Sequence, residues 1–412
     1  MNERDLIYDW NDAGERWEKP PFRVQFDDET LRDGLQSPSV RSPVIEDKLA
    51  VLHLMDRLGI DTADIGLPGA GPHVVRDVMR LAQEIAKHKL KIQANCAART
   101  LKQDITPVVE ISQQTGIPIE VCTFIGSSPI RQYAENWTLE QMLRHTDDAV
   151  SYAVANGLPV MYVTEDTVRA RPEQLRQLFL TAIRCGAKRL CLCDTVGHAT
   201  PTGAANLVRF AAEVVSESGA EIGLDWHGHS DRGLAVVNTI AAIRAGATRV
   251  HGCAIGIGER VGNTPMDQLL VNLKLLGWID NDLTALREYC ELVSRTTDVP
   301  IPVNYPVVGR DAFRTGTGVH AAAVIKAHKK GQDWLADRVY SGVPAGWVGR
   351  RQEIEIGPMS GESNVIFWLE SRGIEPTPER VKAVFGRAKS VDRVLTDTEI
   401  QSALGTVSGT PA

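Results

Sequence analysis

The sequence predicts an α/β protein, a TIM (β/α)8 barrel followed by a small, mainly helical C-terminal region. Short apolar runs rich in β-forming residues recur between longer segments whose apolar residues fall at helical spacing. Eight such β/α units fit into roughly 255 residues, which matches a TIM barrel in both count and length. A doubly wound open sheet is the structural alternative, because it also alternates strands with helices.

The predicted elements follow one another in a regular order. The strand-like runs lie near Arg23–Asp27, Thr62–Gly66, Leu90–Ala94, Ile119–Phe124, Pro159–Val163, Arg189–Cys193, Ile222–Trp226 and Arg249–Ala254. The segments with helical spacing include Glu46–Leu58, Val74–Lys87, Leu139–Asn156, Glu173–Cys185, Thr202–Ser216, Leu234–Ala245 and Pro265–Leu276. The glycines just past helix ends, where a left-handed cap is expected, are Gly59, Gly116, Gly157, Gly186, Gly219 and Gly246.

The alternation stops after Gly277. Residues 280–300 and Val319–Lys330 read as helices, and prolines between them mark an extended connector. We therefore expect an N-terminal extension over 1–21, the catalytic barrel over 22–280, a helical C-terminal region over 281–400 and a tail over 401–412. The end of the chain, from Gly405 onward, is expected to be disordered.

Composition describes an ordinary globular protein and excludes several classes of function. The 412 residues are 43% hydrophobic and 24% charged, and the formal net charge of −7 argues against nucleic-acid binding. The sequence has no apolar run long enough for a membrane span, and its charged N-terminus does not read as a secretory signal. The seven cysteines form no CxxC pair, so we expect reduced, mostly buried thiols in a cytoplasmic protein.

A His-x-His pair ends the seventh predicted strand. Side chains two apart on a strand point to the same face, so His227 and His229 can offer two imidazoles to one metal ion. Barrel closure makes strands 7, 8 and 1 neighbours, and the active site of a TIM barrel lies at the C-terminal ends of its strands. The loop after strand 1 (Asp27–Gln36) is acidic, and the loop after strand 8 (Gly256–Asn263) ends in an amide. An Asp, two His and an Asn can therefore meet, a set that suits divalent Mn, Zn, Mg or Co.

These segments resemble those of a known family. Asp28–Gln36 reads DETLRDGLQ, and His227–Ala235 reads HGHSDRGLA and is followed by GERVGN at Gly258–Asn263. The chain resembles the DRE-TIM metallolyases over roughly residues 22–360, and within them the Claisen-condensing branch of 2-isopropylmalate, homocitrate and citramalate synthases. Shorter matches to that branch lie at Thr164–Asp166, Asp194–Gly197 and Gly318–His320.

The resemblance implies a role for each candidate site residue. The implied metal ligands are Asp33, His227, His229 and Asn263. Arg32 would contact the carbonyl oxygen of a 2-oxo acid, and Thr195 would contact its carboxylate. His320 is the candidate acid/base residue, which related synthases bring in from the partner subunit, so a homodimer is expected. Glu165, at the end of strand 5, would assist or orient it.

The implied reaction is a metal-dependent condensation of acetyl-CoA with a 2-oxo acid. Hydrolysis of the thioester would then release CoA and a 2-alkylmalate-type product, as in 2-isopropylmalate synthase. A divalent ion would polarise the ketone, and a guanidinium would stabilise the alkoxide that forms. Two enzymatic alternatives are a homocitrate- or citramalate-type synthase and an HMG-CoA-lyase-like enzyme that cleaves a C–C bond. A barrel without catalytic activity is a third alternative, and the intact ligand set argues against it.

Several positions depart from the pattern of the condensing branch. Leu35 replaces its usual Glu, as in the related lyases, and Ser230 stands where Asn is usual. Cys122 replaces a His that helps to line the 2-oxo acid pocket, which would leave a smaller and less polar wall. Arg131 could pair with a distal carboxylate of the substrate or be a solvated loop residue. Cys253 could be a catalytic thiol, as in the lyases, or a packed cysteine at a strand end.

Overall fold

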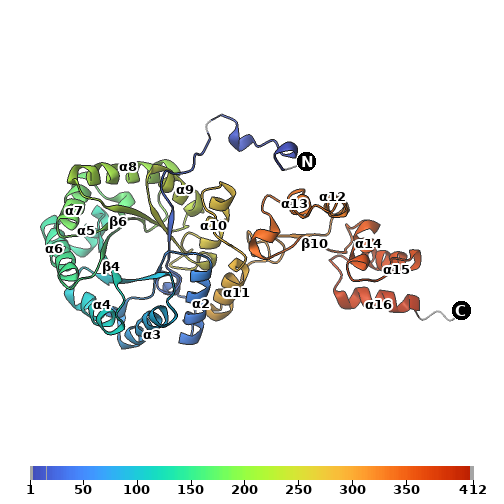
Figure 1. Ribbon diagram of the computed structural model, residues 1–412, viewed down its shortest axis with the longest axis horizontal. Helices are drawn as coiled ribbons and strands as arrows, with labels where there is room; N and C mark the ends of the chain where they lie inside the picture. The colour runs from blue at the N-terminus through green and yellow to red at the C-terminus, as the bar shows by residue number, and fades with distance from the viewer. Residues whose placement is uncertain (1–2, 15, 409–412) are drawn as a thin grey trace. The chain divides into compact units, whose positions relative to one another are not determined.

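The fold is a closed barrel of parallel strands, as the sequence predicts, and not an open sheet. The computed structural model describes residues 3–14 and 16–408, and within them eight strands pair in chain order, with β1 closing against β8. Figure 1 shows the ring of strands with helices around it. The strands are β1 (Gln25–Asp28), β2 (Thr62–Asp64), β3 (Gln93–Arg99), β4 (Ile119–Gly126), β5 (Val160–Glu165), β6 (Arg189–Asp194), β7 (Gly223–Gly228) and β8 (Arg249–Gly252).

Closure of the barrel joins its first strand to its last. Asp27 pairs with Thr62 of β2 on one side and with His251 of β8 on the other. Parallel pairing puts the C-terminal ends of all the strands at one end of the barrel. The loops after β7, β8 and β1 are therefore neighbours in space, although they come from opposite ends of the barrel sequence.

The surrounding helices bury one face each against the barrel. In α3, for example, the buried residues Val78, Leu81, Ala82 and Ile85 recur at helical spacing. The helices are α2 (Ile45–Arg57), α3 (Pro72–His88), α4 (Lys102–Thr115), α5 (Pro129–Glu135), α6 (Leu139–Ala155), α7 (Pro172–Arg184), α8 (Pro201–Ser218), α9 (Ala235–Ala245), α10 (Met266–Leu275) and α11 (Leu286–Thr297). The six glycines predicted past helix ends all have positive φ, which lies between 66° and 121°.

The third strand differs most from the prediction. It was expected at Leu90–Ala94 and instead covers Gln93–Arg99. This segment is rich in alanine, which has a low β-propensity, but Ala94 through Ala98 are all buried between β2 and β4. Burial in the barrel overrides the local preference.

Residues beyond the barrel form a second compact unit. One unit comprises Gly14–Pro300, and the other groups the described residues of Met1–Ala13 with those of Ile301–Ala412. In the second unit, Arg338 pairs with Glu3, and the strands β9 (Arg314–Thr315) and β10 (Glu353–Ile354) pair in parallel. Its larger helices are α12 (Gly318–Lys329), α14 (Glu362–Glu370), α15 (Pro378–Lys389) and α16 (Asp397–Ser408), and the shorter ones are α1 (Glu3–Leu6) and α13 (Asp333–Arg338).

The C-terminal unit has an apolar core of its own. Val365, Trp368 and Leu369 of α14 pack with Val384 of α15 and Ile400 of α16. Because α16 continues to Ser408, residues 405–408 of the segment expected to be disordered are helical. The rest of that segment, 409–412, lies outside the described residues.

Two sequence expectations can be compared directly with the fold. None of the helices in the described part of the chain is long and apolar enough to cross a membrane. All seven cysteines stand at described positions as free thiols, and six of them are buried, as expected.

Candidate active site

A cavity of about 370 Å³ opens at the C-terminal ends of the barrel strands. Its polar side carries Arg32, Asp33, His227 and His229, and Glu165 and Thr195 also line it. Side chains alternate across a strand, so along β7 His227 faces the cavity while Trp226 is buried on the opposite face. The structure thus brings most of the predicted site residues to one place.

Three of the predicted metal ligands face one another around a common point. Asp33 Oδ2 lies 3.5 Å from His229 Nε2 and 3.8 Å from His227 Nε2, and the three residues are buried. These separations are longer than those of hydrogen bonds to a carboxylate. Burial, together with neighbouring His227, lowers the pKa of His229 to about 4, so this imidazole is neutral and can act as a ligand.

The fourth predicted ligand, Asn263, reaches the same place through the loop after β8. Asn263 forms an antiparallel bridge with His229, and its amide nitrogen donates to the carbonyl oxygen of Ile257 at 3.1 Å. The tight path of the loop depends on Gly258, whose φ is 143° and where a Cβ would collide with the Asn263 amide. Ser230, a departure from the family pattern, supports the loop by donating to the Asn263 carbonyl oxygen at 3.3 Å.

Unpartnered polar atoms indicate that this site fits a cation. Asp33 Oδ2 and Asn263 Oδ1 are among the buried atoms that make no hydrogen bond within the described structure. Buried polar atoms of proteins nearly always have a partner. A carboxylate, two imidazoles and an amide oxygen form a donor set that suits a divalent ion of the kinds predicted.

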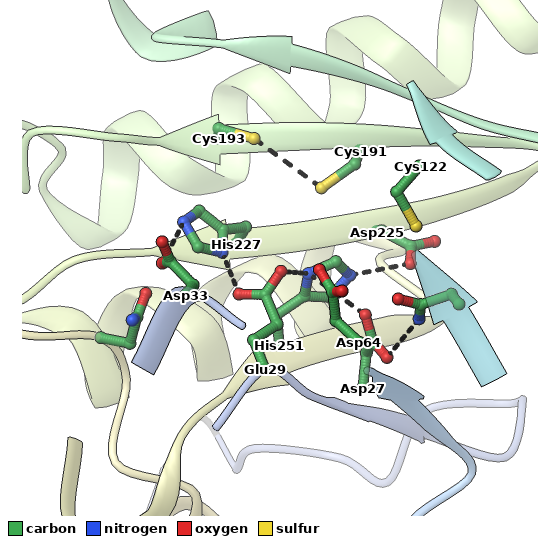
Figure 2. A network of polar contacts seen from close by, with 12 residues as sticks. Asp27, Glu29, Asp33, Asp64, Cys122, Cys191, Cys193, Asp225, His227 and His251 are labelled. Atoms are coloured by element: carbon green, nitrogen blue, oxygen red, sulfur yellow. Dashed lines mark hydrogen bonds and ion pairs between the residues drawn. The ribbon is translucent and has the colours of Figure 1, made fainter. Parts of the chain in front are cut away.

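A buried carboxylate holds one of these histidines in place. Glu29 accepts from His227 Nδ1 at 2.6 Å, which leaves Nε2 of that ring facing Asp33 (Figure 2). The other oxygen of Glu29 lies 3.1 Å from His251 Nδ1, and His251 Nε2 lies 2.9 Å from Asp225. Burial opposes ionisation of Glu29, but His227, Arg32 and His251 hold its pKa well below the usual range. A carboxylate in this position fixes the tautomer and orientation of a metal-binding histidine.

Arg32 points at the same centre and is surrounded by carboxylates. It donates to Asp64 at 2.6 Å, to Glu29 at 3.0 Å and to Asp33 at 3.1 Å. Burial disfavours its charge, but these three carboxylates raise the pKa of Arg32 well above its ordinary value. The guanidinium is therefore permanently charged and rigidly placed beside the proposed ligands.

Glu165 and Thr195 line the cavity at the ends of the neighbouring strands β5 and β6. Burial raises the pKa of the Glu165 carboxyl group, and Arg131 only partly offsets this effect. The Thr195 hydroxyl accepts from the backbone N–H of Asp166 at 2.8 Å, and its carbonyl oxygen accepts from Arg260 at 2.6 Å. Arg260 also pairs with Asp231, so this ion pair joins the loops after β7 and β8.

The two substrate residues predicted on the β4 side have different surroundings. Cys122 is buried and lines the cavity. Arg131 lies on α5 and pairs with Glu135 at 3.5 Å and Glu165 at 3.6 Å. It is not among the described residues that line the cavity. Cys253 is fully buried and is likewise absent from the described residues that line the cavity. This fits a packed cysteine at a strand end better than a catalytic thiol.

His320 belongs to the second unit. It lies in the first turn of α12, and its ring stacks on Tyr340 with centroids 4.1 Å apart. Its role is a proposal that rests on the family resemblance.

Sequence reasoning did not single out the residues behind the ligands. Glu29, Asp225 and His251 belong to the buried polar network that Figure 2 shows, and Asp64 is linked to Glu29 through Arg32. Side-chain alternation along the first strand could have indicated Glu29, since Asp27 and Glu29 share the inward face. It could not have indicated His251, because only the pairing of β1 with β8 places that residue beside them.

Comparisons with known proteins agree with this geometry. The model of the HMGL-like family matches residues 23–293. The chain is 34% identical over 387 residues to a homocitrate synthase AksA from Methanopyrus kandleri, covering 92% of this chain and 91% of that protein. From the same organism, a probable 2-isopropylmalate synthase is 33% identical, covering 90% of this chain and 70% of the relative. A putative (R)-citramalate synthase CimA is 32% identical, covering 95% and 74% respectively.

Solved structures show the same fold. A hydroxymethylglutaryl-CoA lyase from Pseudomonas aeruginosa superposes with a TM-score of 0.58 at 20% identity, covering 72% of this chain and 98% of the lyase. The carboxyl transferase domain of Rhizobium etli pyruvate carboxylase gives a TM-score of 0.53 at 14% identity, covering 94% of this chain and 60% of that one. At these identities the likeness concerns the barrel architecture.

Proposed function

We propose that this chain, which belongs to the HMGL-like family of DRE-TIM barrels, is a metal-dependent acyltransferase of the Claisen-condensing branch. It would join the methyl carbon of acetyl-CoA to the keto carbon of a 2-oxo acid. Hydrolysis of the thioester would then release CoA and a 2-alkylmalate-type acid, with the reaction of 2-isopropylmalate synthase as the model. The relatives at 32–34% identity are named as three kinds of synthase, which supports the reaction class and leaves the 2-oxo acid open.

The observation that carries the proposal is the convergence of three predicted ligands, with the fourth, Asn263, on a loop bridged to His229. Asp33, His227, His229 and Asn263 would hold a divalent ion, and the oxygens Asp33 Oδ2 and Asn263 Oδ1 have no other partner. When bound, the ion would act as a Lewis acid on the keto oxygen of the substrate.

Residues around these ligands would supply the remaining chemistry. Arg32 is fixed by three carboxylates and would stabilise negative charge that develops on the keto oxygen. Thr195 would hold the substrate carboxylate. Removing a proton from the acetyl methyl group needs a base, and we assign this work to His320, assisted by Glu165. The raised pKa of Glu165 suits a group that takes up and releases protons.

The proposal is tested by release of free thiol from acetyl-CoA in the presence of Mn²⁺ and a panel of 2-oxo acids. We expect thiol release with at least one acid. His229→Asn should lose both the thiol release and the tight binding of Mn²⁺. His145→Asn, on α6 and outside the cavity lining, is the matched control and should retain both. If no acid supports release but the protein cleaves 3-hydroxy-3-methylglutaryl-CoA, the lyase alternative replaces the synthase.

A further inference from the structure

One wall of the cavity, on β4, β5 and β6, is made of sulfur-containing and aliphatic side chains. Cys122, Met161, Cys191 and Cys193 form one buried cluster, and Val163 packs against it. They come from the inward positions of β4, β5 and β6, and all five line the cavity. Figure 2 shows Cys191 and Cys193 next to each other on one strand, with Cys122 near Cys191. The sulfurs of Cys191 and Cys193 are 3.8 Å apart, so they form a continuous surface.

The thiols of this wall are neutral and behave as small apolar groups. Burial raises the pKa of Cys122 and of Cys191 well above the ordinary thiol value. For Cys122, the nearby carboxylates of Glu120, Asp64 and Asp27 raise it further. Neutral thiols and thioethers are weak hydrogen-bonding groups and make favourable contacts with aliphatic and aromatic carbon.

The wall also offers no unengaged cation to a second substrate carboxylate, since His251, which lines the cavity as well, already contacts Glu29 and Asp225. Among the described residues that line the cavity, the only Arg or Lys side chains are Arg32 and Arg260. Both lie on the polar side, where Arg32 contacts three carboxylates and Arg260 pairs with Asp231. A buried carboxylate without a partner is strongly disfavoured.

Neither of two arginines near this wall, Arg249 and Arg131, is among the described residues that line the cavity. Arg249 donates to the sulfur of Met161 at 3.1 Å, and it is engaged by Glu120 at 2.6 Å and by Asp225. Arg131 lies 3.5 Å from Glu135 and 3.6 Å from Glu165, and its Nε makes no hydrogen bond within the described structure. A distal carboxylate on the substrate would therefore meet neutral sulfur at this wall.

We propose that the 2-oxo acid of this enzyme carries an uncharged, apolar side chain that packs on Cys122, Met161, Val163, Cys191 and Cys193. Acids with a second carboxylate, such as oxaloacetate and 2-oxoglutarate, are excluded. The inference rests on the proposed function and narrows its substrate class. It also implies that this chain uses a different class of 2-oxo acid from its relative that is named as a homocitrate synthase.

Equilibrium binding tests the inference without the reaction. Each 2-oxo acid is titrated calorimetrically into Mn²⁺-loaded protein in the absence of acetyl-CoA. Oxaloacetate and 4-methyl-2-oxopentanoate form a matched pair, since a carboxylate in one replaces an isopropyl group of similar shape in the other. We expect the apolar acid to bind at least about tenfold tighter. Equal or tighter binding of oxaloacetate, or binding of neither acid, would overturn the inference.

Substitutions in the wall test the residues themselves. Cys191→Asn should weaken binding of the apolar acid by about tenfold or more, because an amide cannot be satisfied there. Val163→Thr is nearly isosteric at a half-buried position and should weaken binding of the apolar acid about three- to tenfold. This milder variant keeps the test valid if Cys191→Asn does not fold. Cys185→Ser, on a thiol outside the described cavity lining, is the control. Unchanged affinity in folded Val163→Thr that still binds Mn²⁺ would contradict the proposal.

The thiol-release assay separates this inference from the proposed function. Tight binding of apolar acids without thiol release would remove the function and leave the pocket assignment in place. Thiol release that is fastest with 2-oxoglutarate would support the function and overturn the inference.

Discussion

At the scale of single residues, the site is organised by carboxylates outside the proposed ligand set. Glu29 contacts Arg32, His227 and His251, so it links the guanidinium, a proposed ligand and the buried interior of the barrel. The proposed ligands could be picked out in the sequence because metal chemistry restricts residue type and spacing. The residues that support them could not, since a buried Glu beside a His depends on which strands pair.

Glu29→Gln should therefore weaken Mn²⁺ binding without unfolding the barrel. Glutamine keeps the size of the side chain but loses the charge that orients the His227 ring, and such changes weaken metal binding about 10- to 100-fold. Calorimetric titration of Mn²⁺ measures the effect. Glu110→Gln, on an exposed position of α4, should bind like the unmodified protein. Equal affinities of the two variants would contradict the assigned role.

A second residue prediction concerns pH. Asp28 is fully buried, where it accepts hydrogen bonds from the Tyr289 hydroxyl and from the Thr30 amide, the latter at 2.9 Å. Burial raises its pKa to about 7, above that of an unfolded Asp. Since the folded state holds this proton more tightly, the stabilisation is complete below the unfolded pKa and is lost as pH rises through the folded one.

Asp28→Asn should remove this pH dependence. Between about pH 5 and about pH 8, the unfolding free energy of the unmodified protein should fall by about 2–3 kcal/mol relative to that of the variant. Urea unfolding of both proteins at the two pH values measures the difference. A constant gap across this range would show that Asp28 is ionised in the folded state.

At the scale of elements, strands were predicted better than the loops that carry the chemistry. Most strand positions followed from apolar runs, and only β3 was displaced, because its alanines are held by burial and not by β-propensity. The loop after β8 was expected to supply Asn263, but its path could not be predicted. That path requires left-handed backbone at Gly256, Gly258 and Gly262 and also at Arg260.

The glycine at 258 should be needed for metal binding and not for the fold. In Gly258→Ala the new Cβ would displace the Asn263 amide, so we expect Mn²⁺ affinity to fall about tenfold or more. Gly203→Ala, on α8 where a Cβ has space, is the matched control. It should lower neither the Mn²⁺ affinity nor the melting temperature. If both variants bind Mn²⁺ like the unmodified protein, the loop does not position a ligand.

At the scale of the whole molecule, the chain has two compact units with separate cores. The barrel was predictable because eight similar units repeat one pattern, and the end of that repeat was visible after Gly277. The pairing of the first residues with the C-terminal unit, through Glu3 and Arg338, was not predictable. Short charged segments carry no periodic signal for their partners.

The proposed homodimer with a shared site can be tested by complementation. His320→Asn and His229→Asn should each be inactive alone. If the partner subunit supplies His320, a mixed dimer has one intact site, and equal co-expression should restore about a quarter of the activity. Both single variants should remain folded, and His320→Asn should bind Mn²⁺ normally. No restoration in demonstrated mixed dimers would place His320 in its own chain's site or outside catalysis.

The closure of β1 on β8 also has a consequence for how the protein is made. Glu29 and His227 are 198 residues apart in sequence, and Asn263 follows later still. A chain emerging from the ribosome holds Asp33 early but cannot assemble the donor set until the last strand and its loop have been synthesised. Until then, β1 has an unpaired edge that can associate with other strands. If the proposed donor set binds a divalent ion, its capture would coincide with the final step of barrel closure, and the ion would stabilise only completed barrels.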